Sequence, residues 1–180
     1  MLVVQNASGK ASKGRRTPER NVKRGTGGLE PGAKAPDFSL PRDGGGTVGL
    51  RDFAGKKLVL FFYPRANTSG CTREAIDFTR HKAAFARAGA EILGVSADPV
   101  KAQDAFKAKH KLTVALASDE KRRMLETYGV WQEKTLYGRK FLGIVRTTVL
   151  IGPDQRIVRI WPRVSVDGHA EDVLAAVKAL

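Results

Sequence analysis

The sequence predicts an α/β protein whose mixed central sheet carries helices on both faces. Two observations support this fold class: apolar, strand-like runs alternate with helical stretches between residues 58 and 129, and a β-hairpin followed by a helix closes the chain. Alternation of this kind favours parallel strands joined by helical crossovers, and the hairpin adds antiparallel strands. With 180 residues, of which 42% are apolar, the chain is long enough for one core without metal or disulfide support.

The first elements surround a continuous apolar run. Residues 58–63 read Leu-Val-Leu-Phe-Phe-Tyr, which is typical of a central strand buried on both faces. A helix is expected over about residues 72–87, because Ala75, Phe78 and Phe85 fall on one face together with Cys71. Upstream, residues 43–46 (Asp-Gly-Gly-Gly) fit a hairpin turn between two short strands. No Gly-Lys-Ser/Thr follows this turn, so a phosphate-binding loop is not expected there.

The remaining elements continue the alternation and then change to antiparallel pairing. Asp98-Pro99 opens a second helix. Ser118-Asp119 is expected to cap a short helix that ends before Gly129, and Gly168 to precede a closing helix. The expected ranges are strand 90–95, helix 100–110, strand 113–117, strand 146–151, turn 152–155, strand 156–161 and the closing helix to residue 180.

The positive charge is high and unevenly distributed. The chain has 32 basic and 18 acidic residues, a net charge of +14, and residues 1–28 alone carry +6. This segment has too few large apolar side chains to form a core, so we expect a disordered basic arm (1–28) followed by one folded domain (29–180). The arm has three readings: a solvated tail, a weak nucleic-acid or anionic-surface contact, or a transit peptide.

Several classes of protein are excluded or disfavoured by what the sequence lacks. No apolar run approaches the roughly 20 residues of a membrane span, and no secretory signal is evident. A single cysteine excludes an intrachain disulfide and a cysteine-cluster metal site, and it points to a reducing, cytoplasmic compartment. The three histidines lack metal-ligand spacing, and no dinucleotide, flavin or haem signature occurs. We therefore expect no metal and no cofactor.

Chemistry concentrates where the buried strand passes into the following helix. Cys71 falls in the first helical turn, where unpaired N–H groups and the helix dipole favour a thiolate. Thr68 stands three residues earlier, where its hydroxyl could reach the sulfur, and Pro64 could shield the sulfur from water. Each residue also has an ordinary structural reading: an inert buried thiol, a helix cap and a strand terminator.

The stretch Pro64-x-x-x-Thr68-x-x-Cys71 resembles the active-site motif of peroxiredoxins, in the peroxiredoxin Q or bacterioferritin comigratory protein branch. The likeness covers residues 29–180 and includes Asn67 to Ala75, Gly94-Val95-Ser96, Tyr137-Gly138 and Gly143 to Thr148. The resemblance implies a thioredoxin-like fold and a thiol peroxidase that reduces hydrogen peroxide and organic hydroperoxides. It also implies that Cys71 is the peroxidatic cysteine and that Pro64, Thr68 and Arg146 complete the site. By sequence alone, Arg146 is only a charged residue opening a strand.

One departure from this branch affects the expected mechanism. Many members carry a resolving cysteine five residues after the peroxidatic one, but this chain has Ile76 there. We therefore expect a one-cysteine cycle, in which an external thiol (thioredoxin, glutaredoxin or a small thiol) reduces the sulfenic acid. We also expect a monomer or a weak homodimer. The alternative is a thioredoxin-like redox sensor or binding protein that oxidises once without turnover.

Ionisation of the thiol does not by itself account for a peroxidase. Lowering the pKa of a cysteine from about 8.5 to about 6 raises its thiolate fraction about thirtyfold at pH 7. The lower pKa also makes the thiolate about thirteenfold less nucleophilic, and this loss cancels most of the gain. The larger contribution must come from positioning the peroxide and stabilising the developing oxyanion, for which Thr68, Arg146 and the amides of Gly70 and Cys71 are the candidate donors. Glu74 could brace Arg146 or Arg73, and Trp131, Tyr137 and Trp161 are expected in the core or at the rim of the site.

Overall fold

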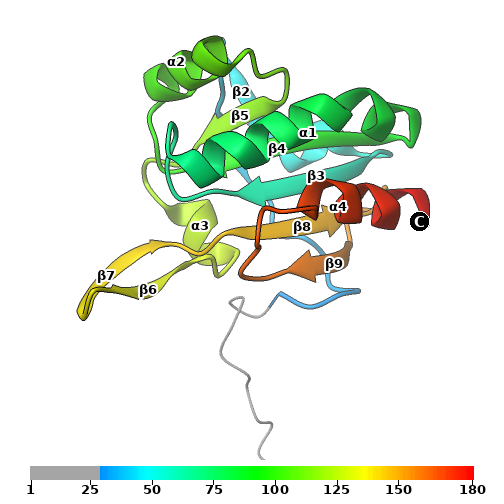
Figure 1. Cartoon of the computed structure of the whole chain (residues 1–180). Coiled ribbons are helices and arrows are strands. Elements are labelled where there is room, and N and C mark those ends of the chain that lie inside the picture. Colours follow the sequence, from blue (N-terminus) through cyan, green and yellow to red (C-terminus); the bar gives the residue numbers. More distant parts are fainter. Residues whose placement is uncertain (1–28) are drawn as a thin grey trace, which may run out of the picture.

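A computed structural model describes residues 29–180 and has a five-stranded central sheet in the order β5-β4-β3-β8-β9 (Figure 1). β3 (Lys57–Phe62), β4 (Ala90–Ser96) and β5 (Ala115–Ser118) run parallel, whereas β8 (Thr147–Ile151) and β9 (Ile157–Trp161) pair antiparallel. The predicted mixed sheet is thus confirmed. The predicted arm, residues 1–28, lies outside the described residues.

Alternation along β3 builds two cores, one on each face of the sheet. Leu58, Leu60 and Phe62 belong to one cluster of buried side chains, and Val59 and Phe61 belong to the other. The second cluster lies under three helices: α1 (Ser69–Arg87), α2 (Val100–His110) and α4 (His169–Lys178). The first cluster is covered by α3 (Arg123–Thr127), the 3₁₀ helix η1 (Leu50–Phe53) and the N-terminal hairpin of β1 (Ser39–Pro41) and β2 (Thr47–Gly49). Helices therefore lie on both faces, as expected for a thioredoxin-like fold.

A second hairpin, β6 (Trp131–Leu136) and β7 (Arg139–Ile144), was not predicted. Its strands mix charged and apolar residues without strict alternation, and its turn has Tyr137 at φ 50° where Asn or Gly is usual. Gly138 at the second turn position is therefore the one usual hairpin signal in this segment. The expectation that Tyr137 lies in the core or at the rim is also wrong, because its side chain is 95% exposed at the hairpin tip.

The short helix after β5 begins later than predicted. α3 starts at Arg123, and its N-cap is Arg122, which has a left-handed backbone at φ 60°. Asp119 nevertheless stabilises this helix: its Oδ2 accepts a hydrogen bond of 2.9 Å from the Leu125 N–H. Asp119 therefore stabilises α3, but it does so from a position before the helix and not as its N-cap.

The part of the chain that the structure describes lacks two features, a membrane-spanning helix and a metal-binding cluster. No helix within residues 29–180 is long and apolar enough to cross a bilayer. The same residues contain no cluster of three His, Cys, Asp or Glu side chains suited to hold a metal ion.

Gly94 of β4 offers a test of the packing beneath α1. A Cβ at this position would lie 2.5 Å from Phe61 Cζ and 2.9 Å from Leu116 Cδ2. Phe61 itself stacks on Phe78 of α1 at 4.8 Å between ring centroids, so it has little freedom to move away. We expect Gly94→Ala to lower the free energy of unfolding by about 1–3 kcal/mol, measured by urea denaturation.

The matched control on the same strand is Glu91→Ala. Glu91 is exposed and forms only a surface ion pair with Lys56, so its removal should cost at most about 1 kcal/mol. Equal losses for the two variants would contradict the argument that Phe61 and Leu116 leave no room at Gly94.

Candidate functional site

Cys71 lies at the N-terminal end of α1, directly after the loop that follows β3. It is the third residue of the helix, because α1 begins at Ser69, three residues before the expected start at about residue 72. The first hydrogen bond of the helical ladder runs from the Thr72 N–H to the Thr68 carbonyl at 2.9 Å. The amides of Gly70 and Cys71 precede this bond and are among the unpaired donors of a helix N-terminus. The Cys71 side chain is buried, with 1% of its surface exposed.

Arg146, which is distant from Cys71 in the sequence, contacts the Cys71 sulfur. It lies between β7 and β8, so the prediction that it opens the strand is wrong by one residue. Its Nη2 donates to Cys71 Sγ at 3.2 Å, and its Nη1 donates to Glu74 Oε2. The guanidinium passes close over Gly70, where a Cβ would come within 3.2 Å of Nη2. The structure thus brings together two of the four predicted site residues, 75 positions apart.

Burial has different effects on the ionisation of Glu74 and of Arg146, the two members of a buried ion pair. Burial raises the pKa of Glu74 to about 7, although the Arg146 charge and hydrogen bond pull it down. The second oxygen, Oε1, is buried and has no hydrogen-bond partner among the described residues. Burial alone would lower the pKa of Arg146, but the attraction of Glu74 and Cys71 outweighs it and raises that pKa. The guanidinium therefore keeps its charge, and Glu74 is the group that titrates near neutral pH.

Thr68 and Pro64 belong to the segment between β3 and α1, and neither forms a hydrogen bond with the Cys71 sulfur in the part of the chain that the structure describes. Thr68 is the N-cap of α1, but its hydroxyl is exposed and donates to the Arg65 carbonyl at 2.9 Å instead of capping the helix. Pro64 is half-buried in the loop after β3. Thr68 precedes Cys71 by three residues and Pro64 by seven, and their roles at the sulfur stay predictions.

A hydrogen-bond network that the sequence did not reveal fixes the loop between Pro64 and Thr68. Asp98, just after β4, accepts from the Ala66 N–H at 2.8 Å and from the Ser96 hydroxyl at 2.7 Å. Gln103 of α2 donates to Ser96 Oγ at 2.9 Å and accepts from the Tyr63 hydroxyl. In the sequence the only indication of this network is Asp98-Pro99, which predicts a helix start. The polar side chains act at long range, which local patterning does not show.

The same loop contains a strained residue that this network and α2 hold in place. Asn67 has φ 63°, and its side-chain oxygen lies 3.1 Å from His110 Nε2. Non-glycine residues adopt this left-handed conformation at a cost, and Asn is among those that tolerate it best. The chain therefore turns at Asn67, directly before Thr68, the N-cap of α1.

His169 is buried, and its imidazole is neutral near pH 7. Its Nε2 lies 2.8 Å from Thr148 Oγ1. Burial, with smaller contributions from Arg146 and Arg159, lowers its pKa to about 4 despite the opposing charge of Asp172. Near neutral pH this histidine adds no positive charge, so Arg146 provides the cation at the sulfur.

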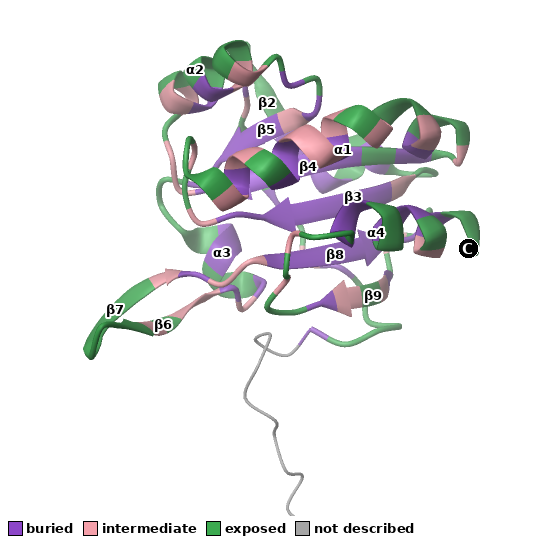
Figure 2. Cartoon of the chain, in the orientation of Figure 1, coloured by how far each residue is buried: buried purple, intermediate pink, exposed green. Residues whose placement is uncertain are grey.

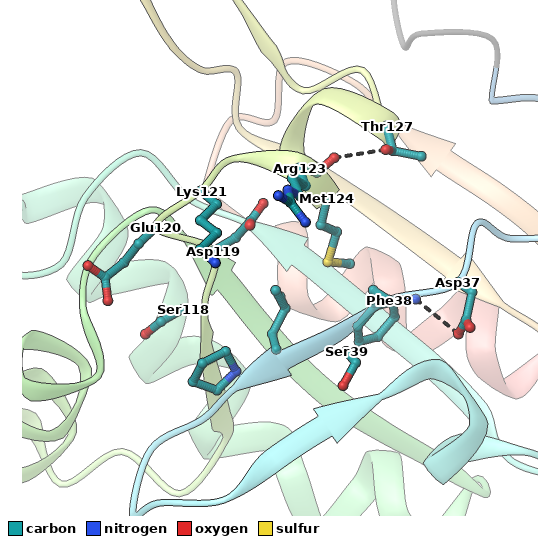
Figure 3. A pocket seen from close by; sticks show the side chains of 12 residues that line it. Asp37, Phe38, Ser39, Ser118, Asp119, Glu120, Lys121, Arg123, Met124 and Thr127 are labelled. Carbon is teal, nitrogen blue, oxygen red and sulfur yellow. Dashed lines mark hydrogen bonds between the residues drawn. The ribbon is translucent and has the colours of Figure 1, made fainter.

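A separate cavity of about 640 Å³ opens between β1 and α3, on the other face of the sheet (Figure 3). Phe38 and Met124 supply apolar wall, while Asp119 and Arg123 supply polar groups. None of the four predicted site residues lines it. The cavity is therefore distinct from the Cys71 environment.

The raised pKa of Glu74 predicts a pH-dependent stability difference. Its carboxyl titrates at about 7 in the folded state against an ordinary value of 4.5. The stability that it contributes is thus complete below about pH 4.5 and is lost as the pH rises through about 7. Glu74→Gln cannot ionise, so the wild type should lose up to about 3 kcal/mol relative to this variant between pH 4.5 and 8. Urea denaturation across this range measures the difference, and parallel profiles would contradict it.

Comparison with known proteins supports the resemblance carried by the motif. Residues 31–160 match the model of the AhpC/TSA family. A putative peroxiredoxin bcp of Coxiella burnetii is 44% identical over 146 residues, which cover 81% of this chain and 97% of the relative. Peroxiredoxin Bcp of Bacillus subtilis is 41% identical over 150 residues, covering 83% of this chain and 96% of the relative.

Solved structures agree with the same assignment. The bacterioferritin comigratory protein of Xanthomonas campestris, studied for its alkyl peroxide reduction activity, is 43% identical with a TM-score of 0.78, covering 85% of this chain and 98% of that one. A cysteine-to-serine mutant of Xylella fastidiosa PrxQ is 39% identical with a TM-score of 0.80, covering 84% of this chain and 96% of that one.

The Xanthomonas protein differs from this chain in its cysteines. It carries at least two, since two different cysteine-to-serine variants of it have been solved, whereas this sequence has Cys71 alone. With the family match over most of the chain and these close relatives, the chain belongs to the AhpC/TSA family, within the Bcp or peroxiredoxin Q group of thiol peroxidases.

Proposed function

We propose that this chain reduces hydroperoxides by a one-cysteine mechanism in which Cys71 is the peroxidatic residue. The observation that supports this most directly is the 3.2 Å contact between Arg146 Nη2 and Cys71 Sγ at the N-terminus of α1. A guanidinium held against a thiolate also lies where the oxygen–oxygen bond of an attacking peroxide would be stretched. The alkyl peroxide reduction of the Xanthomonas relative points to organic hydroperoxides as well as hydrogen peroxide.

The first chemical step oxidises the sulfur and splits the peroxide. The Cys71 thiolate attacks the distal oxygen of ROOH, forming the S–O bond of a sulfenic acid as the O–O bond breaks and RO⁻ leaves. Arg146 faces this leaving oxygen with a charge that Glu74 helps to hold in place. The amides of Gly70 and Cys71 are further donors, and RO⁻ takes a proton to give the alcohol.

Thr68 and Pro64 are proposed to shape the approach to the sulfur. In the structure the Thr68 hydroxyl binds the Arg65 carbonyl and faces solvent. A small rotation of this exposed side chain would allow its hydroxyl to hydrogen-bond the entering peroxide, and Pro64 would limit water on the other side of the sulfur. Cys71 itself is buried, and the proposed route of the peroxide to it passes these two residues.

The second half of the cycle requires thiols from outside the chain. A first thiol RSH condenses with the sulfenic acid, releasing water and forming a mixed disulfide, and a second thiol releases Cys71 with formation of RSSR. Thioredoxin, glutaredoxin and small thiols all have the required chemistry.

We propose residues 29–180 as the catalytic unit, which works as a monomer or weak homodimer in the reducing cytoplasm. The proposed role of residues 1–28 is a weak contact with nucleic acid.

Turnover with defined thiols tests the function itself. We expect the wild type to consume many equivalents of peroxide in the presence of dithiothreitol or reduced thioredoxin, because external thiols regenerate Cys71. The Cys71→Ser variant, which lacks a nucleophilic sulfur, should show none. A single stoichiometric oxidation of the wild type with every donor would contradict the peroxidase and support the redox sensor.

The Arg146→Ala variant tests where the rate acceleration comes from. Removing a preorganised donor to a developing oxyanion typically costs 10²- to 10³-fold. We therefore expect the second-order rate of peroxide oxidation, measured by stopped flow, to fall by about 10²-fold or more. The thiolate fraction, measured by an ultraviolet absorbance titration, should fall far less than the rate.

The matched control is Arg159→Ala, which removes a guanidinium that stacks on Trp161 at 4.4 Å and lies away from the sulfur. Its oxidation rate should stay within about twofold of the wild type. Losses of rate and thiolate fraction in equal proportion for Arg146→Ala would overturn the positioning role and leave ionisation as the only effect.

A further inference from the structure

The β6–β7 hairpin projects from the edge of the molecule at which β3 ends and α1 begins (Figure 1). Its strands pair only with each other and form a separate two-stranded sheet, closed at its base by the Val145 N–H to Val130 carbonyl bond of 2.8 Å. Arg146 follows directly. Whatever the hairpin binds is therefore held on the side of the molecule where Arg146 meets Cys71.

The hairpin carries most of the large exposed apolar side chains of residues 29–180, and its outer end is coloured as exposed in Figure 2. Leu136 is 57% exposed, Phe141 44% and Leu142 62%, and Tyr137 is almost fully exposed. Elsewhere in the described chain only the terminal Leu180 joins them. Such exposure on one small projecting element indicates a binding surface rather than chance.

The register of the strands separates these side chains into two different faces. Directly paired residues point to the same face, and the pairs Lys134↔Phe141 and Leu136↔Arg139 form one of them. We call this face, with Tyr137 at the tip, the cationic face. The opposite face includes Leu142 and an ion pair of 3.5 Å between Lys140 and Glu133.

The two faces differ in charge as well as in shape. The cationic face has Lys134 and Arg139 and no carboxylate. Lys134 Nζ donates to the Ile144 carbonyl at 2.9 Å, and no ion pair is recorded for either cation within residues 29–180. On the opposite face the acid and the base neutralise each other. The cationic face therefore combines exposed leucine and aromatic side chains with uncompensated positive charge.

The turn fixes the outermost side chain in space. Tyr137 and Gly138 both have positive φ, 50° and 74°, as in a tight two-residue hairpin turn. The tip is therefore short and well defined, with the Tyr137 ring beyond the end of both strands. Tyrosine with flanking Lys or Arg is the side-chain combination that settles at a membrane–water interface.

We propose that the cationic face of the β6–β7 hairpin docks on an anionic lipid bilayer. Leu136, Tyr137 and Phe141 would enter the interface while Lys134 and Arg139 meet lipid phosphates. A stable protein–protein contact needs about 800 Å² from each partner with matching shape, and four or five side chains on a narrow projection offer far less. A lipid surface requires no matching shape, and the net charge of +14 attracts an anionic one.

Resting on the proposed function, this docking gives the enzyme a substrate class. Hydroperoxides of phospholipid acyl chains would reach Cys71 at the bilayer surface. The sulfur takes the distal oxygen, the lipid hydroperoxide leaves as the lipid alcohol, and the external thiols reduce the sulfenic acid as before. Reduction of soluble hydrogen peroxide does not need the hairpin.

Vesicle binding by the full-length protein tests the proposal without using catalysis. Co-sedimentation compares vesicles of phosphatidylcholine alone with vesicles that also contain phosphatidylglycerol. We expect binding only to the anionic vesicles, weakened about tenfold by the double change Leu136→Ser and Tyr137→Ser. Arg139→Glu changes the charge by two units and should weaken binding by about twenty-fivefold, since each charge contributes about fivefold.

Leu142→Ser is the matched control, because Leu142 is as exposed as Leu136 but lies on the opposite face. It should bind within about twofold of the wild type. A Tyr137→Trp reporter should shift its emission to the blue on anionic vesicles only, which separates hairpin insertion from attraction of residues 1–28 to the same surface. Unchanged emission, or equal losses for Leu142→Ser and the double variant, would overturn the proposal.

Two further measurements separate this proposal from its alternatives and from the proposed function. Light scattering measures self-association. If the protein binds no vesicles and self-associates in a way that the double variant loses, the hairpin binds a second copy of the chain, and lipid docking is overturned. Cys71→Ser should bind vesicles like the wild type. The double variant should keep hydrogen peroxide turnover and lose at least fivefold in turnover of vesicle-embedded phospholipid hydroperoxide; equal turnover of both substrates would overturn the substrate class.

Discussion

The site depends on one guanidinium that is shared between a carboxylate and a sulfur inside the protein. Arg146 donates to both Glu74 and Cys71, and none of the three side chains is more than slightly exposed. A buried cation is tolerable only when it is paired and hydrogen-bonded. Glu74 meets this requirement at the expense of its own ionisation, as its raised pKa shows. The pair thus keeps a positive charge against Cys71 that water would otherwise screen.

The rest of the fold serves to bring these three groups together from distant parts of the chain. Glu74 and Cys71 share the first turns of α1, whereas Arg146 enters between β7 and β8. The antiparallel pairing of β8 with β3 aligns Thr147 with Phe62, so Arg146 is carried to the end of the strand from which the Cys71 loop departs. The network of Tyr63, Ser96, Asp98 and Gln103 then fixes that loop from the neighbouring strand and helix.

Local patterns were sufficient to predict most of the framework but not the contacts across it. The apolar run at residues 58–63, the helical stripe of Ala75, Phe78 and Phe85, and the turn at residues 43–46 each depend on near neighbours, and the corresponding elements were predicted correctly. The β6–β7 hairpin was missed because Tyr137 occupies a left-handed turn position that usually takes Asn or Gly. Arg146 illustrates a different limit: as a residue it is only a charge beside a strand, and only the resemblance to peroxiredoxins connected it with Cys71. The buried polar network joins residues 63 to 103 through side chains alone, and no periodicity reveals such links.

The lone cysteine has a mechanical consequence for α1. An enzyme that forms an internal disulfide must bring two sulfurs to within about 2.05 Å of each other in every cycle. This chain has no second cysteine to reach, so the first turn of α1 and the Arg146 contact need not open to form an internal disulfide. Every reductant, whether a small thiol or a protein thiol, must therefore reach the oxidised sulfur at its place in the first turn of α1 rather than at a partner cysteine of the same chain.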